Sequence, residues 1–131
     1  MGERRTPSGA ERLNEEGFAA FAARAEDEGP VVMLNLLRFA PDGGRERYAE
    51  YGAAVAPLLE GVGARIVFAG EAAPALLGEE SWDLVLAVEY PSRGAFLGMI
   101  GSEEYAAIAH LRTEALLSGE LHPLDRAPGF G

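Results

Sequence analysis

The 131-residue chain contains neither cysteine nor lysine, and these absences exclude several kinds of chemistry. Without cysteine there are no disulfides, no thiolate zinc sites and no cysteine nucleophile. Without lysine there is no Schiff-base amine and no lysine for a phosphate-binding loop. The two histidines, His110 and His122, do not have a spacing typical of metal ligands. The sequence therefore predicts no metal site and no cofactor.

Positive charge and long apolar runs are also scarce. The 21 acidic side chains outnumber the 11 arginines and give a formal net charge of −10, whereas nucleic-acid binding depends mainly on neutralising phosphates. No apolar run approaches the roughly 18 residues that a membrane span needs. The basic residues near the start are not followed by the apolar stretch of a secretory signal. We therefore expect a cytoplasmic protein that binds neither nucleic acid nor membranes.

Hydrophobic spacing predicts one domain over residues 13–126, preceded by a flexible N-terminus (residues 1–12) and followed by a short tail (residues 127–131). Pro57 falls within the second predicted helix and should kink or divide it. The predicted elements are a helix from Asn14 to Gly29-Pro30, a strand Val31–Phe39, a helix Tyr48–Val62, strands Ala64–Ala69 and Trp82–Tyr90, helices capped by Ser92 and Ser102, and an edge strand Leu121–Leu124.

The order of these elements predicts a ferredoxin-like α+β domain. After one extra N-terminal helix, two β-α-β units share a four-stranded antiparallel sheet that carries its helices on one face. The strands Val31–Phe39 and Trp82–Tyr90 are nevertheless apolar on both faces. A second copy of the chain is the simplest cover for the other face, so we expect a homodimer.

Two polar residues interrupt patterns that are otherwise apolar. Asn35 lies within the first strand, and a buried amide must be hydrogen-bonded. It either donates into a pocket or bonds to backbone or across a dimer. Arg112 lies on the apolar stripe of the last helix, where it either pairs with a carboxylate such as Glu89 or Asp83, extends to the rim, or binds an anionic ligand.

Five further residues are candidates for the site, each with a structural alternative. Arg38 ends a strand, and Arg93 lies in the first turn of a helix, where the dipole disfavours a cation. Either arginine binds a ligand or forms a surface salt bridge. Trp82 either packs at a strand entrance or forms a pocket wall. Tyr90 can donate from its phenol, and His110 is a natural general base, although a lone histidine on a helix flank is more often a surface residue.

Several short motifs together resemble the family called domain of unknown function 1330. The resemblance covers about residues 30–117 and implies a dimeric α/β barrel with a substrate cavity between sheet and helices. That superfamily includes cofactor-free monooxygenases, muconolactone isomerase-like proteins and haem-handling relatives. No catalytic residue carries over, and the two histidines fit haem poorly. The motifs are Pro30-Val-Val-Met-Leu-Asn35-Leu-Leu-Arg38-Phe39, Tyr48-Ala-Glu-Tyr51-Gly, Trp82-Asp83, Tyr90-Pro91-Ser92-Arg93 and Ser102-Glu-Glu-Tyr105.

These observations leave two hypotheses about function. The first is a cofactor-independent enzyme, monooxygenase-, isomerase- or cyclase-like, that acts on a small aromatic or polyketide-like acid. His110 and Tyr90 would then be catalytic, and the substrate would contact Asn35, Arg38, Trp82, Arg93 and Arg112. The alternative is a non-catalytic ligand-binding or interaction module. An enzyme pocket leaves inward-facing polar groups unpaired, whereas a structural module bonds them internally.

Overall fold

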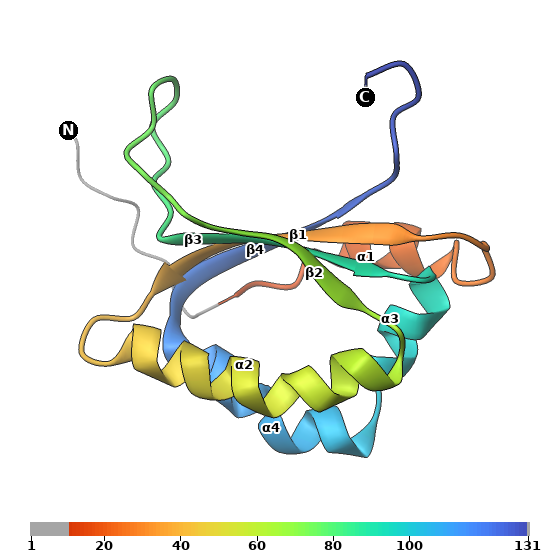
Figure 1. Cartoon of the computed structure of the whole chain (residues 1–131), viewed down its shortest axis with the longest axis horizontal. Coiled ribbons are helices and arrows are strands. Elements are labelled where there is room, and N and C mark those ends of the chain that lie inside the picture. Colours follow the sequence, from red (N-terminus) through yellow and green to blue (C-terminus); the bar gives the residue numbers. More distant parts are fainter. Residues whose placement is uncertain (1–10, 131) are drawn as a thin grey trace.

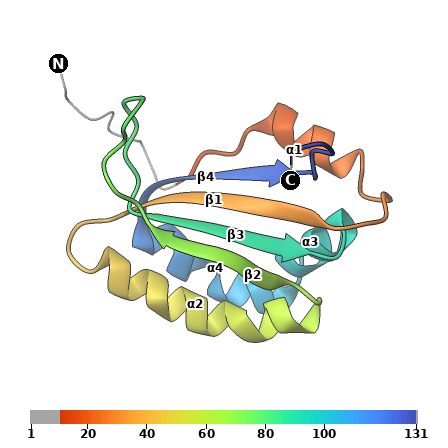
Figure 2. The same cartoon turned by 45° about the horizontal axis from the view of Figure 1, so that its top comes forward.

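Four antiparallel strands form one sheet in the order β2–β3–β1–β4 in the computed structural model, which describes residues 11–130. Residues 1–10 of the predicted flexible N-terminus therefore lie outside the described residues. Helices α2, α3 and α4 lie on one side of the sheet (Figure 1), and α1 lies beyond the edge strand β4 (Figure 2). The predicted ferredoxin-like α+β fold with an extra N-terminal helix is confirmed. The elements are α1 (Glu15–Ala22), β1 (Val31–Phe39), α2 (Gly44–Gly61), β2 (Arg65–Glu71), β3 (Leu84–Tyr90), α3 (Arg93–Ile100), α4 (Glu103–Ala115) and β4 (Leu116–Leu124).

Three helices begin at the polar residues that the sequence indicated. The side chain of Asn14 accepts a hydrogen bond from the backbone N–H of Gly17 and thereby caps α1. Ser92 and Ser102 cap α3 and α4 in the same way. Each cap satisfies a first-turn N–H that has no partner within its helix, which stabilises a helix by about 1 kcal/mol. Helix α1 ends at Ala22, earlier than predicted, because residues 23–26 form turns instead.

Helix α2 is continuous from Gly44 to Gly61 although it contains Pro57. The expectation that this proline divides the helix is therefore wrong. Proline removes one helical hydrogen bond and frees the carbonyl four residues earlier, which belongs to Ala53. Both residues are exposed, so water can satisfy the freed carbonyl and the helix continues.

Strand β4 is longer than the sequence predicted. It begins at Leu116, immediately after α4, whereas only Leu121–Leu124 was expected. Gly119, which precedes the predicted edge strand, lies within β4 and pairs with Leu37 of β1. Pro123 is tolerated because β4 is an edge strand, where a missing N–H need not break a ladder.

Side-chain burial alternates along β1 and distinguishes the two faces of the sheet. Val31, Met33, Asn35 and Leu37 are buried beneath the helices, whereas the residues between them are only partly buried. Fully burying a side chain such as Leu37 stabilises the fold by about 1.5–3 kcal/mol. The helix-covered face holds the core, and the opposite face remains apolar and accessible at Val32, Leu34 and Leu36. Among the described residues, no helix is both long and apolar enough to cross a membrane.

Candidate functional site

A pocket of about 1130 Å³ opens beside β4, between the sheet, α4 and residues 11–14, which run along the edge of the sheet (Figure 2). It extends around this edge, because its lining includes residues from both faces of the sheet. Five of the seven candidate residues from the sequence line it, namely Asn35, Arg38, Trp82, Tyr90 and Arg112. Arg93 and His110 do not.

Arg112 is the centre of the polar part of this pocket. Its Nε and Nη2 donate to the two carboxylate oxygens of Glu11, at 3.0 and 2.8 Å. Nη2 also donates to Oδ1 of Asn35 at 3.0 Å, and Nη1 donates to the hydroxyl of Tyr48 at 3.3 Å. The side chain of Arg112 is only 12% exposed. Both edges of the guanidinium are therefore occupied, one of them by a complete carboxylate.

The carboxylate that binds Arg112 belongs to Glu11, whereas the sequence suggested Glu89 or Asp83. Glu89 pairs with Arg65 on the sheet, and Asp83 accepts a hydrogen bond from the backbone N–H of Phe39. Burial by itself would lower the pKa of Arg112, but the hydrogen bonds and charge of Glu11 outweigh burial and raise that pKa. Arg112 is therefore a cation that depends on a nearby anion.

Gly119 provides the space that this carboxylate occupies. It lies on β4 opposite Leu37, and a Cβ at Gly119 would come within 2.9 Å of Oε2 of Glu11 and 3.2 Å of its Cγ. A side chain at this position would come too close to Oε2, so the carboxylate of Glu11 would have to shift from the place that it occupies. Arg112, Asn35 and Gly119 thus form a notch that fits one carboxylate group.

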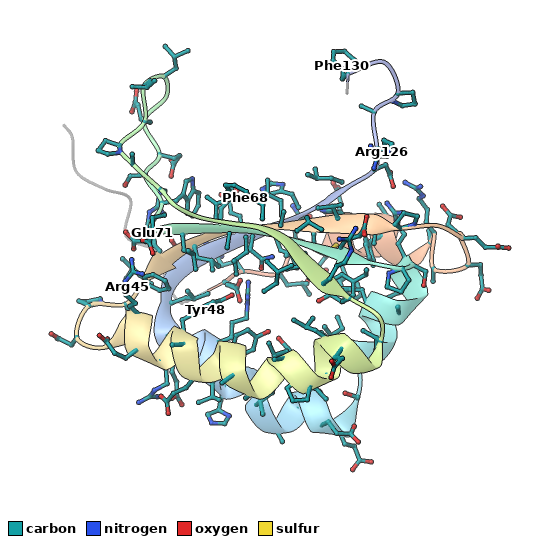
Figure 3. The ribbon with its side chains drawn as sticks, in the orientation of Figure 1. Arg45, Tyr48, Phe68, Glu71, Arg126 and Phe130 are labelled. Atoms are coloured by element: carbon teal, nitrogen blue, oxygen red, sulfur yellow. The ribbon has the colours of Figure 1, made fainter. Side chains whose placement is uncertain are left out.

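Four tyrosines surround the guanidinium or line the pocket near it. The rings of Tyr51 and Tyr48 have their centroids 5.7 and 6.0 Å from the Arg112 guanidinium carbon, and the Tyr51 hydroxyl is 2.9 Å from that of Tyr105. Tyr48 is labelled in Figure 3, where it extends from α2 toward the sheet. The Tyr90 hydroxyl is hydrogen-bonded to none of the described residues, although Tyr90 is only 5% exposed. Its phenol is therefore free to donate to a molecule in the pocket.

The buried tyrosines give the protein a predictable response to alkaline pH. Burial raises the pKa of Tyr48, Tyr51 and Tyr90 above the ordinary value of 10. Below pH 10 these phenols are neutral in both folded and unfolded chains, so their full contribution to stability is present. Above pH 10 only the unfolded chain ionises them readily, and the free energy of unfolding falls as pH rises.

We therefore expect Tyr48, Tyr51 and Tyr90 to ionise only together with unfolding, in an alkaline titration that follows tyrosinate absorbance and circular dichroism in parallel. Ionisation of these three tyrosines near pH 10 in the folded protein would contradict this expectation.

Arg38 forms a separate cluster on the face of the sheet opposite the helices. Its Nε donates to the carbonyl of Ser81 at 2.6 Å, its Nη1 to the hydroxyl of Ser118 at 2.8 Å and its Nη2 to Glu80 at 2.6 Å. The guanidinium carbon also lies 4.2 Å from the ring centroid of Trp82. Three hydrogen bonds and the contact with the Trp82 ring hold Arg38 in place, and they join β1 to β4 and to the segment before β3.

Arg93 connects helices to the C-terminal segment. It donates to both carboxylate oxygens of Asp125, at 3.1 and 3.3 Å, and its guanidinium carbon lies 5.2 Å from the ring centroid of Phe21. Arg24 donates to the same carboxylate at 3.0 Å. Hydrogen bonds from Arg93 and then Arg24 lower the pKa of Asp125. Asp125 compensates the unfavourable position of Arg93 in the first turn of α3 and links that helix to α1.

The histidines lie outside the pocket's polar centre. His110 is exposed on α4, and the Nε2 of His122 lies 2.9 Å from a carboxylate oxygen of Glu120 on the exposed part of β4. Within residues 11–130 no group of three or more His, Cys, Asp or Glu side chains could hold a metal ion.

Two residues of the site were missed in the sequence. Glu11 lies in a polar segment that shows no periodicity, and Gly119 lies outside every element predicted from the sequence. One available signal was that an arginine on an apolar helix stripe requires a carboxylate, but nothing in the pattern selects Glu11 from 21 acidic residues.

Comparison with known proteins places the chain in a family. No curated protein matches it. A protein of unknown function from Rhodopseudomonas palustris is 34% identical and has a TM-score of 0.80, with 92% of this chain and 98% of that chain covered. The methylated form of that protein is 36% identical, with a TM-score of 0.80 and coverages of 94% and 99%.

A dimeric protein of unknown function and ferredoxin-like fold from Bacteroides fragilis is 14% identical, with a TM-score of 0.52 and coverages of 76% of this chain and 98% of that chain. At this identity the likeness shows the fold alone. The family model described as domain of unknown function (DUF1330) matches residues 43–118, which is more than half of the chain. The chain therefore belongs to the DUF1330 family.

Proposed function

We propose that the pocket binds a small organic carboxylate, with Arg112 as the anchor. The observation that carries this proposal is the buried guanidinium on the pocket wall, whose Nε–Nη2 edge already holds a carboxylate in a two-bond arrangement. Arginine binds planar carboxylates in this bidentate manner and remains charged when buried. Asn35 orients Nη2, and Gly119 leaves space for the carboxylate.

The remainder of the pocket suits an aromatic acid. Apolar and aromatic side chains dominate the wall beyond Arg112, which is the usual composition of a site for a small organic molecule. Ring edges and faces of tyrosine and phenylalanine pack favourably against an aromatic ligand. The wall includes Met33, Tyr51, Tyr90, Phe96, Met99, Ile100 and Tyr105.

Titration calorimetry with benzoate and with benzamide tests this proposal. The two probes have nearly the same shape, but only benzoate carries the charge that Arg112 would bind. We expect benzoate to bind at least ~10-fold more tightly, since hydrogen bonds to charged groups contribute about 1.5–3 kcal/mol. Equal binding of both probes, or no binding of benzoate at millimolar concentration, would refute a carboxylate site.

We further propose that the bound acid is a substrate and that Tyr90 is the catalytic residue, in a cofactor-independent reaction. This second candidate is favoured by the unpaired phenol of Tyr90 on the pocket wall. Because burial raises its pKa, this phenol stays protonated and can donate to a carbonyl or phenolic oxygen. His110 has no part in this proposal because it does not line the pocket.

A Tyr90→Phe variant tests this role in the same calorimetric series. It should weaken binding of one or more of the ortho, meta and para hydroxybenzoates while leaving benzoate unaffected, because only the hydroxylated acids can use the phenol. A non-catalytic binding module remains the alternative. Such a module would bind these acids and return them chemically unchanged, whereas an enzyme would convert a suitable acid.

We also propose that the protein is a homodimer joined through the sheet face that the helices leave uncovered. Half-buried apolar residues from β1 and β3 form this face, and Phe68 of β2 adds a 60% exposed ring to it (Figure 3). Residues 72–82 and 125–130 extend past the same face (Figure 1). They carry Leu76, Leu77 and Phe130, each more than 90% exposed. A second copy of the chain would cover this face, and residues 72–82 and 125–130 would then pack against the second copy.

A further inference from the structure

The contact between Glu11 and Arg112 has the geometry of a bound ligand, although Glu11 belongs to the chain itself. Both carboxylate oxygens face the Nε–Nη2 edge of the guanidinium, and one of them lies only 2.9 Å from the place that a Cβ at position 119 would take. The other edge of the guanidinium is used by Tyr48 and Asn35. A second carboxylate therefore cannot bind Arg112 in this way while Glu11 is present.

The segment that carries Glu11 is held weakly. No backbone hydrogen bond between described residues involves residues 11–13, and Leu13 is 72% exposed. Regular structure begins only at Asn14, which caps α1. Helix α1 has its own attachments, through Phe21 in the core and through Arg24 to Asp125. Residues 11–13 can consequently leave the pocket without disturbing α1.

Arg112 cannot easily remain without an anion. A buried guanidinium that loses its carboxylate keeps its charge and leaves donors unsatisfied, which strongly destabilises that state. Among the described side chains bonded to Arg112, Glu11 is the only anion, since Asn35 and Tyr48 are neutral. Two occupants satisfy this requirement, the side chain of Glu11 or an organic acid, and they exclude each other.

We propose that Glu11 is a built-in competitor for the carboxylate pocket: an incoming organic acid displaces its side chain from Arg112 and releases residues 11–13 from the edge of β4. This inference rests on the proposed carboxylate site. Residues 11–13 then have two states. In the ligand-free protein Glu11 holds them against Arg112, and in the liganded protein they are released. Ligand binding is thereby reported at the surface as greater mobility of the Arg12–Leu13 bond, whose two residues are already exposed.

The first test compares benzoate affinity in the unaltered protein and in a Glu11→Gln variant. Glutamine keeps the size of the side chain but removes the charge that competes. The apparent affinity of a site rises when a competing closed state is lost, so we expect Glu11→Gln to bind benzoate about 10-fold more tightly. The matched control is Glu16→Gln, which removes the same charge from an exposed position on α1 and should leave the affinity unchanged.

The second test follows the segment itself by limited trypsin digestion, with mass spectrometry used to detect the fragment that begins at Leu13. Saturating benzoate should accelerate cleavage after Arg12 several-fold, and benzamide should not. Glu11→Gln should be cleaved rapidly without any ligand. Gly119→Ala should also be cleaved rapidly, but it should bind benzoate less tightly, because its new methyl group would lie 2.9 Å from the oxygen of a carboxylate bound as Glu11 is.

The outcomes separate this inference from the proposed function. If neither the unaltered protein nor Glu11→Gln binds benzoate, the carboxylate site is refuted. The proposed role of Glu11 as its competitor is then refuted as well. If both bind benzoate with equal affinity and cleavage after Arg12 does not respond to benzoate, the carboxylate site stands. Glu11 is then only a structural partner of Arg112, and the inference is overturned.

Discussion

Replacing Arg112 by methionine should reduce the affinity for benzoate about 100-fold. Methionine has a similar length and fills the space beside Tyr48 and Tyr51, but it has neither charge nor donors. Removing one partner of a buried, hydrogen-bonded charge pair costs about 2–5 kcal/mol, and 1.4 kcal/mol corresponds to a factor of ten. Titration calorimetry with benzoate measures the change directly.

Two further variants test whether the loss of affinity comes from the bidentate guanidinium of Arg112. Arg112→Lys keeps the charge but not the bidentate geometry, so its affinity for benzoate should lie between that of the unaltered protein and that of Arg112→Met. Arg65→Met removes one positive charge from an exposed ion pair on β2 and should leave benzoate binding unchanged. Circular dichroism checks that each variant is folded. A folded Arg112→Met protein that binds benzoate normally would place the ligand elsewhere.

Replacing Leu34 by aspartate should convert the proposed homodimer to a monomer. Leu34 lies on the central strand β1, and its side chain is on the face that the helices leave uncovered, between Ala87 of β3 and His122 of β4. A carboxylate there would be buried without a partner in a sheet-to-sheet interface, which costs several kcal/mol in each subunit. In the free subunit the same carboxylate would be solvated, so folding should survive.

Size-exclusion chromatography with light scattering at micromolar concentration measures this change. The unaltered chain should have twice the mass of one chain, and Leu34→Asp the mass of one. Ala56→Asp, which adds the same charge at an exposed position on α2, should remain dimeric. A monomeric unaltered chain at this concentration would overturn the proposed dimer.

Much of the fold was predictable because its causes are local. The caps Asn14, Ser92 and Ser102 satisfy N–H groups within three residues of themselves, so their effect can be seen in a short stretch of sequence. Apolar residues on both sides of β1 predict a strand that is covered twice. The deviations depend on the surroundings instead, since Gly119 is held in β4 by pairing with Leu37 of the distant strand β1, and Pro57 is tolerated at an exposed position of α2.

The site was predictable only in part. The anomalies at Asn35 and Arg112 could be recognised because an amide or a guanidinium at a buried position always requires partners. The identity of those partners could not be predicted from the sequence. Arg112 and Glu11 are 101 residues apart in the chain, and the sequence suggested Glu89 or Asp83 in place of Glu11.

The sequence alone thus determined the kinds of elements in this protein, their order, the ferredoxin-like topology and the positions where polar groups are out of place. Those properties follow from backbone preferences and from the side-chain periodicity of helices and strands. Only the tertiary structure decided that Glu11 reaches Arg112, that Gly119 leaves space for a carboxylate, and that His110 is directed away from the pocket. Such contacts join distant parts of the chain, and their formation depends on how whole elements pack, because no local pattern encodes which side chains will meet.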